Sequence, residues 1–346
     1  MRFDPSDSFF PAPASRAPPA RRPRRRSPTG PAPPQSPLNY QPFPSWARVD
    51  LGAQEQGPAA FFAAGASLAS LDGVLRPTPP FADAWRQRLA LKAAAAGAKI
   101  LRLREDEAAL RDAEHLAVSE DPGPAGRLHR LWRSLARQNA RLDAERLCEA
   151  LRLLDAPAAG DLSALFRELQ ELAQGPSDSV TLAAQAAARA YHLCPAPEGE
   201  VFALWTADLM LALRLRWERP APLLMTKILE PSLRRGPRGA RPRPNDRGWP
   251  QAVASAYALA AGDAHALALE LSRRTEKLLA AAPKLRAKRA SRVVELLFGD
   301  DCVAPSRAAK DSGLSDRAAR RLFDRLVDLG AVREVSGRPS FRLYGL

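Results

Sequence analysis

Between Pro58 and Met225, apolar residues recur at intervals of three and four positions, with polar residues between them. This spacing places the apolar side chains on one face of an α-helix, so it predicts amphipathic helices. β-branched residues, which strands favour, are scarce in the same region. Proline, glycine or Asp-Pro pairs separate the predicted helices, which cover residues 59–75, 81–103, 105–118, 125–137, 143–154, 162–173, 180–191 and 200–216. We therefore expect a mainly α fold whose body is a helical bundle.

A longer helix is predicted over residues 249–282. Its apolar side chains fall on one face, which we expect to be buried: Val253, Tyr257, Ala260, Ala264, Leu267 and Leu271. The loop before it, residues 234–247, is rich in Gly, Pro and Arg and has no hydrophobic anchor. This loop is interpreted as an ordinary mobile loop, or as an arm that contacts phosphates. The all-α domain is predicted over residues 47–283, with the basic loop at 232–247.

Residues 284–346 have a different order of elements and are predicted to form a small domain of their own. A helix over residues 289–298 ends at Gly299. A short helix capped by Ser306 follows, and Gly313 then breaks the chain. These signals predict two helices joined closely to a third.

Ser315 is placed to cap that third helix by accepting a hydrogen bond from a backbone N–H two or three residues later. The helix has a buried stripe made of Ala319, Leu322, Phe323, Leu326 and Leu329. Gly330 is the expected left-handed stop. Residues 331–335 and 340–344 alternate like strands around a turn at 336–339. This order of elements predicts a winged helix-turn-helix with a β-hairpin wing.

The exposed face of the helix after Ser315 carries the side chains that we expect to contact DNA. Arg317, Arg320 and Arg321 lie toward its N-terminal end, which in helix-turn-helix proteins meets the base edges. A guanidinium can donate two hydrogen bonds to one guanine. Two further residues are expected to contact the phosphate backbone: Ser315 at the start of this helix, and Arg338 at the tip of the wing. The sequence thus predicts a DNA-binding, regulatory protein whose partner is double-stranded DNA.

Two alternatives remain open at this stage. Asp324 could pair with Arg320 and Arg321 on a solvated surface, although such pairs are worth only a few tenths of a kcal/mol and a phosphate could displace them. Winged helices also dock proteins. The rival prediction is therefore a non-enzymatic interaction protein, with the helical domain as the surface for a protein partner or for self-association.

The positive charge of the chain is concentrated in three segments. The formal net charge is +14, yet residues 1–48 hold eight Arg against two Asp, residues 232–247 hold six Arg against one Asp, and residues 284–346 hold fourteen Lys or Arg against eight acids. The rest of the chain is therefore slightly acidic. This distribution is expected of a protein that neutralises phosphates locally. An Arg-rich genome is the alternative explanation.

Residues 1–46 are predicted to be a disordered tail, because 13 of the 33 prolines precede Trp46 and little apolar surface is available. The tail could graze phosphates, be inert, or follow from a start codon placed too far upstream. It has no apolar segment after its basic run, so no signal peptide is predicted. The whole chain has no stretch of eighteen uncharged apolar residues, and Cys148, Cys194 and Cys302 lie far apart in the sequence. These features predict a soluble cytoplasmic protein without disulfides or membrane contact.

Catalytic chemistry finds little support in the sequence. The histidines, His115, His129, His192 and His265, form no His-x-x-His pair and are interpreted as surface or core-edge residues. Phosphate-binding glycine motifs are absent. The charged run 102–112 is interpreted as a salt-bridged helix face and not as an active site. We predict no enzyme activity, no catalytic residue, no cofactor and no metal.

Several segments carry a family resemblance. They begin Trp85-Arg-Gln-Arg-Leu, Arg104-Glu-Asp-Glu-Ala, Asp121-Pro-Gly-Pro-Ala, Leu314-Ser-Asp-Arg-Ala and Ser336-Gly-Arg-Pro-Ser. The chain, over about residues 43–346, resembles an uncharacterised family of alphaproteobacterial, largely rhizobial, proteins, the domain of unknown function 1403. The resemblance implies a bacterial cytoplasmic setting and no particular catalytic activity.

The plan of a helical body followed by a winged helix also resembles that of Fic-type proteins. Their catalytic His-x-Phe-x-Asp/Glu-Gly-Asn-Gly-Arg loop does not occur in this sequence. The resemblance therefore does not imply AMP transfer.

Overall fold

The computed structural model describes residues 43–47, 57–115, 121–156, 160–194, 196–234, 239–285, 290–336 and 341–346. All of these residues belong to one compact unit, Pro37–Leu346. Most of the predicted disordered tail, residues 1–42, lies outside the described residues. The division into an all-α domain at 47–283 and a separate domain at 284–346 stays a prediction.

The described residues are mainly helical, as the sequence predicts. The α-helices of the body are α1 (Gly57–Leu75), α2 (Ala82–Ile100), α3 (Glu107–His115), α4 (Gly123–Arg137), α5 (Ala144–Leu153), α6 (Leu162–Gln174), α7 (Ser179–Leu193), α8 (Pro197–Leu215), α9 (Leu224–Lys227) and α10 (Trp249–Ala281). The C-terminal elements are α11 (Ala290–Gly299), α12 (Pro305–Ser312), α13 (Asp316–Asp328), β1 (Arg333–Glu334) and β2 (Tyr344–Gly345). Short 3-10 helices cover Ser45–Ala47, Pro231–Leu233 and Ala282–Lys284.

Each helix predicted for the body occurs, with ends that differ by a few residues. Asp143, Asp161 and Asp178 cap α5, α6 and α7 by accepting hydrogen bonds from first-turn N–H groups. These caps fix where the helices begin. Helix α9 was not predicted, because four residues are too few to show a helical period.

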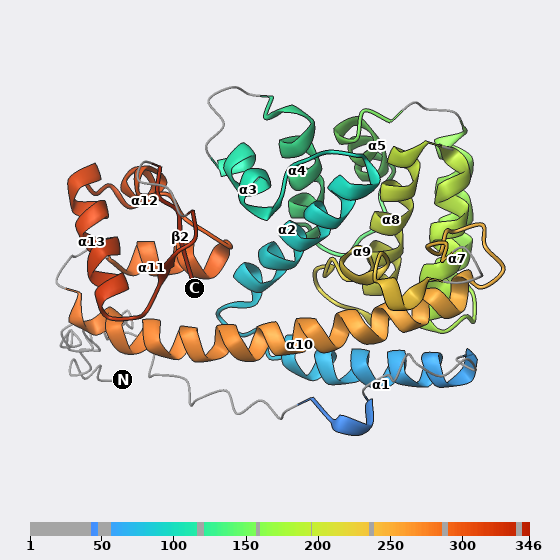
Figure 1. Cartoon of the computed structure of the whole chain (residues 1–346), viewed down its shortest axis with the longest axis horizontal. Coiled ribbons are helices and arrows are strands. Elements are labelled where there is room, and N and C mark those ends of the chain that lie inside the picture. The colour runs from blue at the N-terminus through green and yellow to red at the C-terminus, as the bar shows by residue number, and fades with distance from the viewer. Residues whose placement is uncertain are drawn as a thin grey trace, which may run out of the picture. The chain divides into compact units, whose positions relative to one another are not determined.

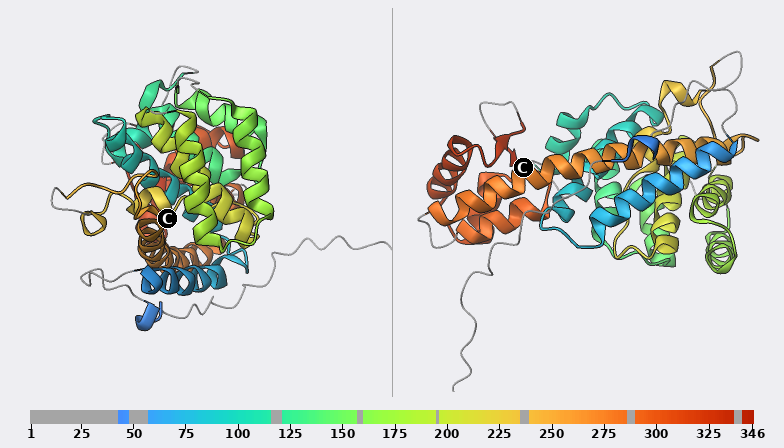
Figure 2. Two further views of the ribbon diagram at one scale, coloured as in Figure 1. Left: turned by 90° about the vertical axis from the view of Figure 1, so that its right-hand side faces the viewer. Right: turned by 90° about the horizontal axis from the view of Figure 1, so that it is seen from below.

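The long helix α10 organises the packing (Figure 1). Helix α1 lies along it, and the two views of Figure 2 agree on this arrangement. On another side α10 contacts α2, α7 and α9. The indole N–H of Trp85 in α2 donates to the carbonyl oxygen of Ala264 at 2.8 Å, and that of Trp249 donates to Ala184 in α7 at 2.9 Å. Every member of the apolar stripe predicted for this helix is buried.

Two helices, α1 and α10, have the length and apolar composition that a membrane span requires. In α10 most of the apolar window, 72%, is buried inside the protein, against 44% in α1. Buried core helices of soluble proteins have the same length and composition.

A buried carboxylate joins α8, α9 and α10. Asp208 in α8 is 1% exposed. It accepts hydrogen bonds from the backbone N–H groups of Leu223 and Leu224, at 2.9 and 3.1 Å, and from the Tyr257 hydroxyl at 3.1 Å. Burial raises the pKa of Asp208 to about 7, although these donors oppose the shift. The side chain thus takes the place of a local cap at the start of α9.

This raised pKa predicts a pH dependence of stability. The pKa of Asp208 is about 7 in the folded protein against an ordinary 3.8. Below about pH 4 the Asp208 carboxyl is protonated in both the folded and the unfolded chain. As pH rises from about 4 to about 7, the unfolded chain releases this proton first, so the free energy of unfolding falls. We expect the wild type to lose a few kcal/mol relative to Asp208→Asn over that window, at about 1.4 kcal/mol per pKa unit. Urea unfolding of both proteins from pH 4 to 8 measures the difference, and a constant difference would contradict the prediction.

The C-terminal elements follow the predicted order. The β strands pair antiparallel, with Glu334 opposite Tyr344, and Val303 forms a further antiparallel bridge to Tyr344. The rings of Phe323 and Tyr344 stack at 4.6 Å between centroids, so α13 packs directly on β2. Gly330 has a positive φ of 62°, as expected for the residue that stops a helix.

Two details of this part differ from the prediction. Helix α12 has Ala304 at its N-cap and proline at its first position, so Ser306 does not cap it. Proline suits that position because a backbone N–H in the first turn of a helix has no partner within the helix, so its absence costs nothing. The strands are shorter than 331–335 and 340–344, since only two residues on each side pair regularly. The predicted turn falls partly outside the described residues, because 337–340 are not among them.

Candidate nucleic-acid interface

Helix α13 has one buried and one exposed face. Its buried face consists of Ala319, Leu322, Phe323 and Leu326. Figures 1 and 2 show that α13 lies at the outer edge of the C-terminal elements, on the side away from α2 to α9. The exposed face is therefore not covered by another described helix, and a large partner could reach it.

The exposed face carries the arginines that the sequence singled out. Arg317, Arg320 and Arg321 are all exposed. Over the described part of the chain, none of these guanidiniums takes part in an ion pair or a side-chain hydrogen bond, so the pairs with Asp324 considered above do not form. All their N–H groups are therefore available to phosphate or base acceptors.

Ser315 occupies the N-cap of α13. Its hydroxyl oxygen accepts a hydrogen bond from the Ala318 N–H at 3.3 Å, and its own side chain is exposed. First-turn N–H groups without helical partners and the helix dipole favour an anion at this end. Ser315 and the arginines thus lie at the same end of one helix. Arg338, the fifth predicted residue, lies outside the described residues.

A set of charged side chains gathered around two buried aspartates connects these elements to the body, and we call it the buried charge cluster. It consists of Asp300, Asp301, Arg307, Arg111, His115, Arg133 and Arg137. The two aspartates follow α11 directly, whereas the histidine and most of the arginines come from α3 and α4. Their pairing places residues separated by more than 160 positions side by side.

Asp300 is the centre of this cluster. Both of its oxygens accept from Arg133, at 2.8 and 2.9 Å. One of them also accepts from Arg137 at 2.8 Å and from Arg307 at 2.7 Å. Burial would raise the pKa of Asp300, but the charge and hydrogen bonds of Arg133, together with the charge of His115, hold this pKa at about 2. Asp300 is therefore charged at neutral pH and ties α4 to α12.

Asp301 anchors the C-terminus in the same region. Its carboxylate accepts from Arg111 in α3 at 2.9 Å. Arg88 in α2 donates to the carbonyl oxygens of Asp301 and Leu346, at 3.3 and 3.2 Å. A Cβ on Gly345 would lie 2.4 Å from the Asp301 carbonyl oxygen, so only glycine fits there. These contacts fix β2, and with it α13, relative to α2, α3 and α4.

The family assignment follows from comparison with known proteins. A family model described as "Protein of unknown function (DUF1403)" matches residues 36–346. The chain belongs to this family. No curated protein matches the sequence. The description of this family names no activity.

The buried charge cluster corrects two interpretations of the sequence. The charged run 102–112 is interpreted from the sequence as a salt-bridged helix face, but Arg111 is 8% exposed and its ion pair is with Asp301 in the interior. His129 was assigned to the surface or the core edge, but it is 0% exposed and its Nδ1 lies 3.2 Å from the Leu110 carbonyl oxygen. Burial and the nearby Arg133 lower its pKa to about 3, so His129 is neutral.

His115, Asp301 and Cys302 place their possible ligand atoms within 4.8 Å of one another. This donor set does not fit a cation well. The Asp301 carboxylate already pairs with Arg111. Burial, reinforced by the charge of Asp301, raises the pKa of the Cys302 thiol well above its ordinary value, so the thiolate that a metal needs is disfavoured.

Proposed function

We propose that the C-terminal elements form a winged helix-turn-helix that binds double-stranded DNA, with α13 in the major groove. The observation that carries this proposal is the exposed face of α13. It presents Arg317, Arg320 and Arg321 without ion-pair partners among the described residues. Arginine is the side chain best suited to contact both phosphates and guanine edges.

The order and pairing of the elements support this proposal. A third segment joins the two strands of the proposed wing. Here Val303, between α11 and α12, pairs with Tyr344 of β2, and β2 pairs with β1. The chain turns between α12 and α13 at Gly313, whose φ is 66°. The bridge at Val303 and the turn at Gly313 support the proposed winged helix-turn-helix.

In this proposal the residues have distinct roles. Ser315 and the first turn of α13 contact a phosphate, because the N-terminal end of the helix favours an anion. Arg338 contacts the backbone from the wing. Arg317, Arg320 and Arg321 approach base edges. The buried charge cluster keeps α13 in a fixed orientation relative to the body. The protein acts as a non-enzymatic, regulatory DNA-binding protein of the cytoplasm.

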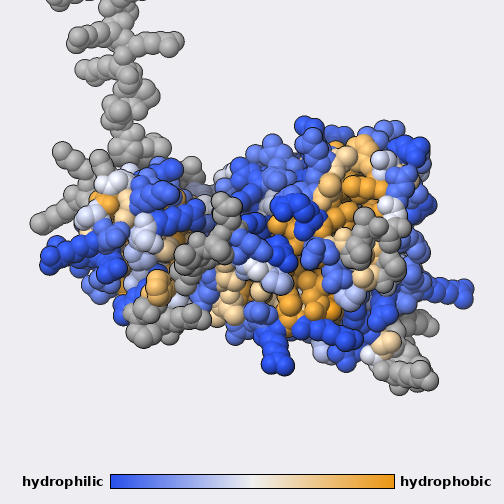
Figure 3. All heavy atoms as spheres, turned by 90° about the horizontal axis from the view of Figure 1, so that it is seen from above, coloured by the Kyte–Doolittle hydropathy of each residue, from blue (hydrophilic) through white to orange (hydrophobic). Residues whose placement is uncertain are grey.

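A protein-docking function is the alternative, and exposed apolar side chains favour it. Phe341, just before β2, is 73% exposed, and Val327 on α13 is 40% exposed. Apolar side chains also gather over the helical body on the face shown in Figure 3, which is the kind of surface that a protein partner or a second copy would cover.

Amide hydrogen exchange of the intact chain tests which surface DNA occupies. Adding duplex DNA is expected to slow exchange in residues 315–325, because α13 becomes enclosed in the groove, and to leave α5 and α6 unchanged. DNA binding without protection of α13 would contradict the proposal. Protection of α13 by a protein partner, with no effect of DNA, would favour the docking alternative.

A further inference from the structure

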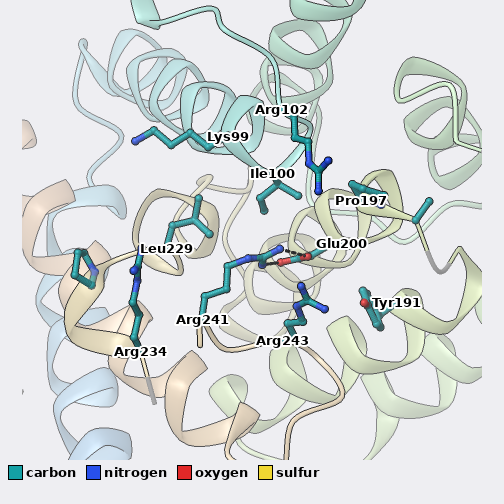
Figure 4. A pocket seen from close by; sticks show the side chains of 12 residues that line it. Lys99, Ile100, Arg102, Tyr191, Pro197, Glu200, Leu229, Arg234, Arg241 and Arg243 are labelled. Atoms are coloured by element: carbon teal, nitrogen blue, oxygen red, sulfur yellow. Dashed lines mark hydrogen bonds and ion pairs between the residues drawn. The ribbon is translucent and has the colours of Figure 1, made fainter. Parts of the chain in front are cut away.

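A second basic site lies in the helical body, far from α13 along the chain. A cavity of about 680 Å³ opens between the C-terminal end of α2, the N-terminal end of α8 and the segments 229–234 and 241–243. Its charged lining consists of Lys99, Arg102, Arg234, Arg241, Arg243 and Glu200 (Figure 4). This volume is in the range of pockets that bind small molecules, about 300 to 1,000 Å³.

The lining is strongly cationic. It contains Lys99 and four arginines but a single carboxylate, that of Glu200. Glu200 pairs with Arg241 through both of its oxygens. Among the described residues, Lys99, Arg102, Arg234 and Arg243 make no ion pair and no side-chain hydrogen bond. The pocket therefore has a formal charge of +4 after that pair is formed.

The backbone holds these arginines at the pocket. Pro242 and Pro244 are buried, so Arg241 and Arg243, which alternate with them, are directed to the other side of the segment. The Asp246 carboxylate accepts from the Arg243 backbone N–H at 2.7 Å. The expectation that residues 234–247 have no hydrophobic anchor is therefore wrong, because Pro242 and Pro244 anchor this loop.

Side chains from four segments converge in this pocket: the end of α2, α7, α8 and the loop before α10. Figure 4 shows Arg102, Arg241 and Arg243 directed toward Glu200 from different sides, with Tyr191 facing the same space. Arg102 follows α2 with a positive φ of 58°. The positive charge of Arg243 lies close enough to Arg241 to repel its guanidinium, and a bound anion would offset that repulsion.

We infer that this pocket binds a small phosphorylated organic molecule that carries at least two phosphate groups. One phosphate cannot engage all the unpaired cations, whereas a diphosphate supplies enough oxygens for bidentate contacts with several guanidiniums. The cavity is larger than a diphosphate alone. Ile100, Leu229 and Pro231 provide apolar walls for an organic group, as in a nucleoside diphosphate.

The site is separate from the DNA interface proposed above. The segment 239–248 precedes α10, and α11 to α13 follow it. A helix of 33 residues is about 50 Å long. The phosphates that bind here thus need not be those of the duplex on α13, and the inference does not depend on the proposed function.

Isothermal titration calorimetry of the intact chain tests the inference with ADP, pyrophosphate and inorganic phosphate as probes. ADP and pyrophosphate are expected to bind one per chain, and phosphate much more weakly. The double variant Arg102→Gln/Arg243→Gln removes two charged donors and is expected to weaken ADP binding roughly a hundredfold. Both side chains are exposed, so the fold should persist.

A matched control separates a specific site from general charge. Arg167→Gln/Arg216→Gln removes two exposed arginines elsewhere, and Arg216 has a positive φ of 56° like Arg102. The control should bind ADP as the wild type does. Absence of ADP and pyrophosphate binding would overturn the inference, as would equal weakening in both double variants. Loss of duplex binding in Arg102→Gln/Arg243→Gln with unchanged ADP binding would instead assign the pocket to the DNA backbone.

Discussion

Replacing Asp300 with asparagine is expected to lower the free energy of unfolding by about 3 kcal/mol, the lower end of the range for breaking a buried ion pair. Asp300 is 1% exposed and accepts from Arg133, Arg137 and Arg307. Without its charge, Arg133, whose side chain is 4% exposed, would be left without its closest partner. Arg137 and Arg307 are partly exposed and can turn to water, which limits the cost.

Urea unfolding at pH 7, followed by tryptophan fluorescence, measures this loss. Asp328→Asn is the matched control, because Asp328 is exposed on α13 and the substitution makes the same change in charge. The control is expected to change stability by less than about 0.5 kcal/mol. If both variants were equally stable, the buried charge cluster would not hold the C-terminal elements to the body.

The sequence predicted the helices because each has its own local signals. Apolar periodicity, aspartate caps and Gly330 act within a few residues of the positions that they control. The exposed face of α13 could be predicted in the same way. Ser315 marks where the helix begins, and the apolar stripe that includes Phe323 determines which side chains point away from the core. Short strands carry little periodicity, so the ends of β1 and β2 could not be predicted in the same way.

The buried charge cluster could not be predicted, because its partners lie far apart in the sequence. A local reading pairs Arg111 with acids in its own helix. The structure pairs it with Asp301, 190 positions later. One signal was present: Arg133 and Arg137 are one turn apart in α4, among residues such as Trp132 that are buried. Charged side chains on an otherwise apolar face indicate a buried partner.

Part of the cationic pocket beside Glu200 could be predicted from the sequence. The composition of the basic loop indicates a possible contact for phosphates. The pocket beside this loop also needs Arg102 and Glu200, which come from other segments. Only the packing of α2 against α8 and α9 brings these residues together. A composition count could locate the charge of the loop but not the cavity beside it.

The triple variant Arg317→Ala/Arg320→Ala/Arg321→Ala is expected to lose about a hundredfold or more in affinity for duplex DNA. Each good base contact of an arginine is worth about 1 to 3 kcal/mol, and 1.4 kcal/mol is a factor of ten. All three side chains are exposed, so their removal should leave the fold intact. The control Arg167→Ala/Arg216→Ala/Arg273→Ala removes the same charge from exposed positions elsewhere.

The measurement that tests the central claim most directly is fluorescence anisotropy of a labelled duplex, titrated with the intact chain and both triple variants between about 50 and 200 mM salt. The intact chain and the control are expected to bind with a steep negative dependence on salt, whereas the α13 variant binds weakly throughout. Equal binding by all three proteins, or no binding by the intact chain at the lowest salt, would contradict the assignment of α13 as a DNA-binding helix.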